Sequence, residues 1–152
     1  MTFKAFALLA LVALGGCSTA EPNWAPDAEV AQARFVAEGP TSVTLFTVIN
    51  NRSGSGAHAG LLINASEQVM FDPAGTWQHP RLPERNDVHY GITPRMVDFY
   101  IDYHARETFR VVEQTLVVSP ATAELVMQRA KAYGAVPKAQ CSNAITTILR
   151  GV

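Results

Sequence analysis

The sequence predicts an α+β domain with a small antiparallel β-sheet packed against helices, and three observations lead to this prediction. Residues 42–49 and 108–118 form two long runs rich in β-branched side chains, which is typical of strands. Two shorter runs, residues 58–63 and 67–71, flank the turn-like residues 64–66 and indicate a hairpin. Helical start signals appear late in the chain, between and after these runs, which favours the α+β class over an all-β fold.

The run at residues 42–49 carries apolar side chains on both of its faces. Val43 and Leu45 fall on one face, and Phe46 and Val48 fall on the other. A strand that is apolar on both sides is typical of the middle of a sheet covered by other layers. We therefore expect a central strand here.

Two Pro-containing start signals predict the long helices. Thr93-Pro94 suits an N-cap and first helical residue, for a helix running to about Arg106. Ser119-Pro120 predicts a second helix, covering residues 121–133 and stopped by Gly134.

The remaining segments have weaker patterns. Residues 76–93 contain two prolines and are expected to form one long loop, in which Trp77 and Tyr90 either line a groove or cover the core. Residues 28–37 are expected to form a short helix or an irregular lead-in to the first strand.

Composition limits the classes of protein to which the chain can belong. The 152 residues are 48% hydrophobic and 16% charged, with a formal net charge of −1. Such a chain folds as one globular domain with a real core. No block of like charge is present, so we expect no nucleic-acid partner and no polybasic membrane contact.

The N-terminus has the pattern of an export signal. Lys4 precedes an apolar run, residues 6–14, that is too short to span a bilayer comfortably. The stretch Leu14-Gly15-Gly16-Cys17 resembles the lipobox of bacterial lipoproteins. That resemblance implies cleavage before Cys17 and acylation of its thiol. A plain secretory signal is the alternative.

The resemblance divides the chain into three parts. Residues 1–16 are expected to be a lipoprotein signal peptide, residues 17–40 a lipidated tether and residues 41–152 a single domain. Ser18, rather than aspartate, follows Cys17. By similarity to enterobacterial sorting, this favours the outer membrane, so we expect a lipid-anchored envelope protein that faces the periplasm.

Cys141 is the residue most suggestive of chemistry. If Cys17 carries lipid, Cys141 is left without an intrachain partner in an oxidising compartment. It begins a stretch with an apolar stripe at helical spacing, made by Ala144, Ile145, Ile148 and Leu149. The N-terminal end of a helix favours the thiolate, which is the nucleophilic form of cysteine. A small buried hydrophobe is the alternative interpretation.

A cysteine nucleophile needs a base and a group that orients the base. Of the four histidines, His58 is preferred because it begins a strand directly after a glycine-rich loop; His79, His89 and His104 are the others. If Ile63 pairs with residue 67 or 68, Asp72 or Pro73 lies opposite His58.

Asp72 is therefore the expected orienting group, and a simple turn role before Pro73 is its alternative. Glu67 lies at the wrong end of the hairpin. Neither an HExxH nor a CxxC motif occurs in the sequence, so we expect no metal site and no cofactor.

Together, these motifs resemble the circularly permuted papain-like (NlpC-type) enzymes. Three features carry the resemblance. They are His58-Ala59-Gly60 followed by three apolar residues, Asp72 after the next strand, and Cys141-Ser142 at the start of a helix. In the permuted branch the histidine strand precedes the cysteine helix, as it does here.

The resemblance implies a fold and a chemistry. Cys141 would be the nucleophile, His58 the base and Asp72 the orienting residue in attack on an amide, ester or thioester carbonyl. The first N–H groups of the helix would hold the oxyanion. Peptidoglycan peptides and lipid acyl groups are the substrates expected in an envelope.

The chain departs from the family at Gln140, where many permuted members have an aromatic residue or asparagine. A non-catalytic envelope lipoprotein of the same fold, with a binding or structural role, is the alternative function.

Overall fold

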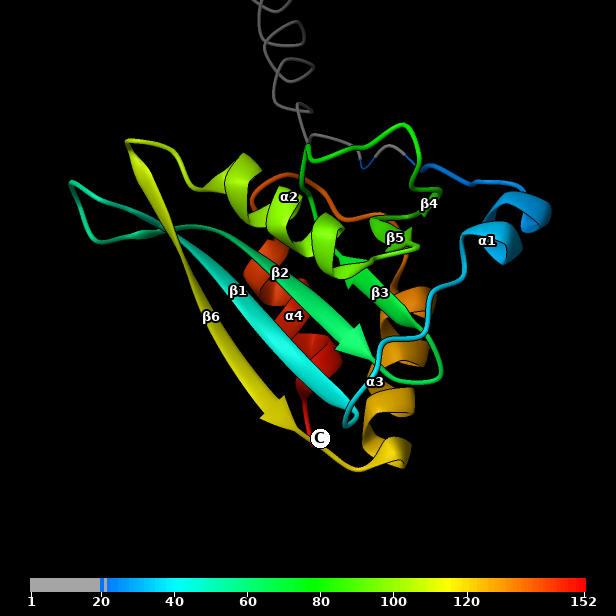
Figure 1. Cartoon of the computed structure of the whole chain (residues 1–152). Helices are drawn as coiled ribbons and strands as arrows, with labels where there is room; N and C mark the ends of the chain where they lie inside the picture. Colours follow the sequence, from blue (N-terminus) through cyan, green and yellow to red (C-terminus); the bar gives the residue numbers. More distant parts are fainter. Residues whose placement is uncertain (1–19, 21) are drawn as a thin grey trace, which may run out of the picture.

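The computed structural model describes residue 20 and residues 22–152, and within them the chain forms an α+β domain (Figure 1). The strands are β1 (Ser42–Asn50), β2 (Gly56–Asn64), β3 (Gln68–Phe71), β4 (Glu84–Arg85), β5 (Val88–Tyr90) and β6 (Phe109–Val117). The helices are α1 (Asp27–Ala33), α2 (Pro94–His104), α3 (Pro120–Tyr133) and α4 (Cys141–Leu149). The six strands form one sheet in the order β4-β5-β3-β2-β1-β6, and all neighbouring strands are antiparallel. The predicted fold class is confirmed at this level.

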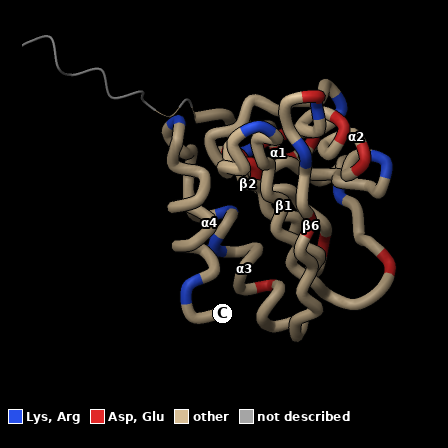
Figure 2. The backbone as a smooth tube through the Cα atoms, turned by 90° about the vertical axis from the view of Figure 1, so that its left-hand side faces the viewer, with Lys and Arg blue, Asp and Glu red and all other residues tan. Residues whose placement is uncertain are grey.

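Helices cover both faces of the sheet. Figure 2 views the strands edge-on and shows α3 and α4 on one side of them, with α2 on the other. Beneath α3 and α4 lies a core that includes Val43, Leu61 and Ile145. A second core lies beneath α2 and is built from Phe46, Met70, Trp77, Ile92 and Tyr100. Because β1 contributes to both cores and lies between β2 and β6, the prediction of a central strand is confirmed.

The predicted helix boundaries follow from local capping. Thr93 is the N-cap of α2, and Pro94 begins the helix. The Ser119 hydroxyl accepts a hydrogen bond from the Thr122 N–H at 3.1 Å, which satisfies one of the free donors at the start of α3. Gly134 ends α3 with a φ of +89°, a value that favours glycine. α4 begins at Cys141, as predicted.

The prediction that residues 76–93 form one loop is wrong. They contain β4 and β5, and β5 pairs with the outer edge of β3. Strands of two and three residues are too short to show an alternation of apolar and polar residues, and the neighbouring prolines are typical of loops. Trp77 and Tyr90 are buried, so they cover the core rather than line a groove.

The register of the β2–β3 hairpin also differs from the expected one. Ile63 pairs with Val69, not with residue 67 or 68. The last pair joins Leu61 to Phe71, so one further step places Asp72 beside Gly60. His58 is therefore a diagonal neighbour of Asp72, two residues away along β2 and on the same face. The pairing of β3 covers Leu61 to Asn64 of β2, and the earlier half of β2 extends past the end of β3.

Part of the expected tether belongs to the folded domain. Val30 and Ala33 of α1 pack against the core beneath α3 and α4. The Phe35 carbonyl accepts a hydrogen bond from the Gln68 N–H at 2.8 Å, and Trp24 forms a β-bridge with Arg85. The predicted signal peptide and Cys17 lie outside the described residues. None of the helices in the described part of the chain has the length and hydrophobicity needed to cross a membrane.

Candidate active site

His58 and Asp72 form the centre of the candidate site. Nε2 of His58 lies 2.6 Å from Oδ1 of Asp72, which confirms the prediction that the two side chains are neighbours on one face. The Tyr100 hydroxyl donates a second hydrogen bond to the same oxygen at 2.7 Å. Asp72 is only 2% exposed, and a carboxylate at such depth needs these partners to remain charged.

Two glycines leave the space that this arrangement needs. A Cβ atom on Gly60 would lie 2.1 Å from the Tyr100 hydroxyl oxygen. A Cβ atom on Gly75 would lie 1.7 Å from Oδ2 of Asp72. Real Cβ atoms do not approach other atoms so closely, so both positions must lack a side chain for Asp72 to keep its place.

The two charges stabilise each other. Burial alone would raise the pKa of Asp72, but the hydrogen bond and charge of His58, together with the Tyr100 hydroxyl, lower it below 3.8. Burial alone would lower the pKa of His58, but Asp72, with smaller contributions from Cys141, raises it above 6.5. Near neutral pH the site therefore favours an ionised carboxylate beside an imidazole that accepts a proton readily.

Cys141 lies in the same pocket as His58. The pocket has a volume of about 420 Å³ and is lined by β1, β2, the turn before α4 and the first turns of α4. Since Nε2 of His58 faces Asp72, Nδ1 is the nitrogen left for the thiol. Ala139 has a left-handed φ of +66°, which bends the chain immediately before the helix begins.

The start of α4 presents free hydrogen-bond donors. The backbone N–H groups of Cys141, Ser142 and Asn143 make no hydrogen bond to any residue that the structure describes. The N-cap residue Gln140 does not satisfy them, because its side-chain oxygen accepts instead from the Asn143 side-chain amide at 2.6 Å. These donors, at the positive end of the helix dipole, suit an anionic oxygen.

Sequence reasoning missed two residues of α2 in this site. No motif in the sequence singles out Tyr100, and His104 is one of the three histidines not preferred as the base. The His104 ring instead stacks on His58, with ring centres 5.3 Å apart and planes 13° apart. Burial lowers the pKa of His104, so its ring is neutral near pH 7, and Nδ1 donates to the Tyr100 carbonyl at 2.9 Å. The spacing of four residues, which puts both side chains on one helix face, was the available signal.

The other candidates have structural roles. His79 packs edge-on against Phe99, and His89 is buried against Trp77. Glu67 forms an ion pair with Lys131 at 2.7 Å, on the hairpin end far from His58. Among the described residues, His58, Asp72 and His104 are the group that brings three potential metal ligands together.

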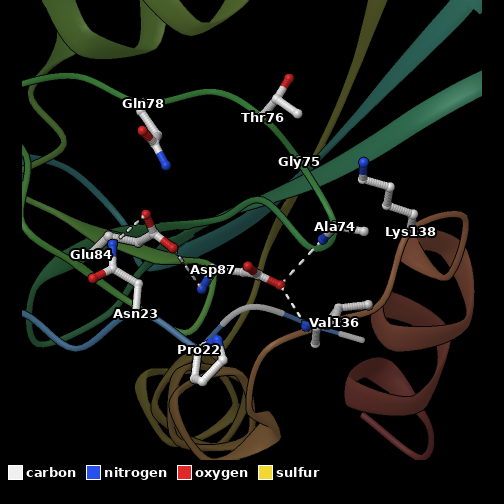
Figure 3. Close-up of a pocket in the computed structure, with 11 residues that line it drawn as sticks. Pro22, Asn23, Ala74, Gly75, Thr76, Gln78, Glu84, Asp87, Val136 and Lys138 are labelled. Atoms are coloured by element: carbon white, nitrogen blue, oxygen red, sulfur yellow. Dashed lines mark hydrogen bonds between the residues drawn. The ribbon is translucent and has the colours of Figure 1, made fainter. Parts of the chain in front are cut away.

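Asp87 holds two loops of the site in place. Its Oδ2 accepts hydrogen bonds from the N–H groups of Ala74, at 3.2 Å, and Val136, at 2.8 Å. Figure 3 shows this carboxylate pointing between the two segments, at the side of a separate pocket of about 620 Å³ that does not include Cys141 or His58. The backbone carbonyl of Asp87 also accepts from the Asp72 N–H at 2.8 Å. One residue thus connects the segment around Asp72 with the segment that leads to Cys141.

Comparison of the chain with protein-family models, with curated proteins and with solved structures gives no match. A function is therefore inferred from the geometry of the site.

Proposed function

We propose that this protein is a thiol hydrolase or acyltransferase, with Cys141 as nucleophile, His58 as base and Asp72 as the residue that orients the base. The observation that carries the proposal is the 2.6 Å hydrogen bond between His58 and buried Asp72, in the pocket where α4 presents Cys141. A nucleophile, a base and a third group arranged in series are the general requirement for covalent catalysis.

The proposed reaction has two halves. The Cys141 thiol gives its proton to Nδ1 of His58, and the sulfur attacks the carbonyl carbon. The negative charge that develops on the carbonyl oxygen is held by the free N–H groups of the first turn of α4. When the intermediate collapses, the imidazolium of His58 donates its proton to the leaving nitrogen, oxygen or sulfur, and an acyl group remains on the thiol.

Water or another acceptor then releases the acyl group. His58 takes a proton from this acceptor as it attacks and returns it to the Cys141 sulfur as the thioester breaks. Asp72, fixed by Tyr100, keeps Nε2 of His58 protonated, so that Nδ1 presents its lone pair to the thiol. Water gives hydrolysis, and a second nucleophile gives acyl transfer.

The wider proposal follows the resemblance to permuted papain-like enzymes of the NlpC type. The order of histidine strand and cysteine helix supports it, as does the position of His58 on β2, an inner strand of the sheet. The resemblance of the stretch that ends at Cys17 to a lipobox supports a lipoprotein of the bacterial envelope, and Ser18 favours anchoring in the outer membrane. Peptidoglycan peptides and lipid acyl groups are the substrate classes within reach of such an anchor.

Alkylation of the native thiol tests the proposal. We expect iodoacetamide to modify Cys141 faster than an ordinary exposed thiol at pH 5–6, because His58 lies in the same pocket and can take the thiol proton. His58→Ala should slow this reaction at least about tenfold, the equivalent of about 1.4 kcal/mol of lost stabilisation. His79→Ala removes a histidine outside the pocket and should leave the rate unchanged.

An acyl-enzyme trap provides the second readout. The protein is mixed with an activated thioester and then analysed by peptide mapping. The wild type should carry the acyl group on Cys141, and the Cys141→Ala and His58→Ala variants should carry no acyl group. A Cys141 that resists alkylation from pH 5 to 8 until the protein unfolds would contradict the enzyme proposal and favour a non-catalytic lipoprotein.

A further inference from the structure

We propose that His58, Asp72 and His104 form a binding site for one zinc-like dication, and that its occupancy switches the thiol off. Metal binding itself is independent of the function proposed above, whereas its effect on the thiol rests on that function. The three residues come from β2, from the turn after β3 and from the last turn of α2, so no linear motif announces the site.

The ligand atoms are already close together. His58, Asp72 and His104 each offer one ligand atom, and all three atoms lie within 4.8 Å of one another. Zinc binds imidazole nitrogen and carboxylate oxygen at about 2.0–2.2 Å, so ligand atoms in a tetrahedral site are roughly 3.3 Å apart. To share a metal, the His58 and Asp72 atoms must separate from the observed 2.6 Å, and one of the two nearly parallel imidazole rings must turn so that both nitrogen lone pairs point to the ion.

The surrounding hydrogen bonds orient two of the three ligands. Nδ1 of His104 donates to the Tyr100 carbonyl at 2.9 Å, which fixes the tautomer and leaves the lone pair on Nε2. The Tyr100 hydroxyl holds Oδ1 of Asp72 at 2.7 Å. A ligating histidine that donates its other N–H to a carbonyl, and a ligating carboxylate with its own donor, are the usual supports of metal sites.

The chemistry of the set favours zinc among common dications. Two imidazoles and one carboxylate match the three-protein-ligand sites of zinc proteins, with the fourth position open to water. Calcium and magnesium prefer oxygen ligands. The metal would also supply the positive charge that a carboxylate only 2% exposed requires.

When a metal is bound to His58, this histidine does not act as the base for Cys141. Nε2 faces Asp72, and a metal bound there leaves the single proton of the neutral imidazole on Nδ1. Nδ1 is then a donor and does not accept the proton of Cys141. The thiolate–imidazolium pair fails to form, although the thiol itself stays in place.

A zinc titration of the folded protein tests the inference. With Zn²⁺ alone as the probe, competition against a chromophoric chelator at pH 7.5 should give one site per chain. Co²⁺ should give the visible absorption of a tetrahedral site. His104→Gln should weaken zinc binding by about tenfold or more, and Cys141→Ala should retain it. His79→Gln is the matched control, because its histidine lies outside the cluster, and it should bind zinc as the wild type does.

Zinc should also slow alkylation of Cys141 by iodoacetamide, and a chelator should restore the rate. No stoichiometric binding of Zn²⁺ by the wild type, or equal affinity in wild type and His104→Gln, would overturn the inference. The two proposals fail separately. A thiol that is inert in metal-free buffer contradicts the enzyme alone, and a reactive thiol in a protein that does not bind zinc contradicts the metal site alone.

Discussion

The hydroxyl group of Tyr100 occupies the space that a side chain on Gly60 would need. The two residues belong to α2 and β2, and the hydroxyl reaches Asp72 across the position where a Cβ atom would lie. The absence of a side chain at Gly60 thus lets a helix residue bind the carboxylate that lies beside Gly60 on the same face of the sheet.

Gly60→Ala is predicted to destabilise the fold and loosen the site. The added Cβ atom would lie 2.1 Å from the Tyr100 hydroxyl, so the ring must move and the bond to Asp72 is lost. Overpacking of this kind costs about 1–3 kcal/mol. Urea unfolding measures the cost, with Gly56→Ala as control, since a Cβ atom there meets nothing within 4 Å. Equal stability of the two variants would contradict this account of Gly60.

Tyr100→Phe is predicted to lower the free energy of unfolding by about 1.5–3 kcal/mol, the usual range for a hydrogen bond to a charged group. The hydroxyl is one of the partners that lower the pKa of buried Asp72. Tyr103→Phe, which removes an exposed hydroxyl bonded to Thr76, should change stability by less than about 0.5 kcal/mol. Chemical denaturation of both variants measures the two free energies of unfolding. A similar decrease in both variants would show that the buried hydrogen bond stabilises the fold no more than the exposed one.

The stacked histidines should titrate on opposite sides of pH 6.5. The folded-state pKa of His58 is raised, so its contribution to stability is complete below pH 6.5 and is lost as pH rises through that pKa. The folded-state pKa of His104 is lowered, so stability instead increases with pH between that pKa and 6.5. NMR titration of the ring C–H signals measures both values directly.

Stability measurements provide an independent check on His58. His58→Gln should remove the fall in unfolding free energy that the wild type shows as pH rises above 6.5. An unchanged slope in the variant would mean that His58 is not the group whose protonation stabilises the fold.

Asp87→Ala is predicted to destabilise the protein by about 1–3 kcal/mol for each N–H group that it leaves unpaired. It should also slow alkylation of Cys141, because the segment that carries Val136 leads to the thiol. Asp87→Asn retains an acceptor oxygen and suits the left-handed φ of +68°, so it should recover most of both properties. Loss of stability without any change in alkylation would limit Asp87 to a structural role.

The resemblance of residues 14–17 to a lipobox predicts a mature chain that begins at Cys17 and carries two or three acyl chains. Mass spectrometry of protein extracted from membranes measures both the new N-terminus and the added mass. Cys17→Ser should abolish the modification and release the protein from the membrane fraction. An unmodified Cys17, or a different N-terminus, would contradict the prediction.

Local signals in the sequence predicted much of the fold. Thr93-Pro94, Ser119-Pro120 and Gly134 determine helix ends through short-range hydrogen bonds and backbone angles, so their positions agree with the structure. The strands β4 and β5 were missed because two or three residues show no period, and they form only by pairing with the edge of β3.

The site was predictable only in part, because its pieces meet through tertiary packing. His58 and Asp72 share a hairpin, so their proximity follows from a short stretch of sequence even with the register shifted. Tyr100 and His104 reach them only when α2 packs on the sheet, which no local pattern encodes. The role of Gly60 becomes visible only once the position of Tyr100 is known.

The order of the site residues along the chain has a consequence for biogenesis. His58, Asp72, Tyr100 and His104 are all synthesised before Cys141. The sheet and its buried ion pair can form first, and the thiol joins them only when α4 packs against β2, a contact between distant segments. A nascent chain would thus hold the His58–Asp72 pair without Cys141, and the complete site would form as a late step of folding.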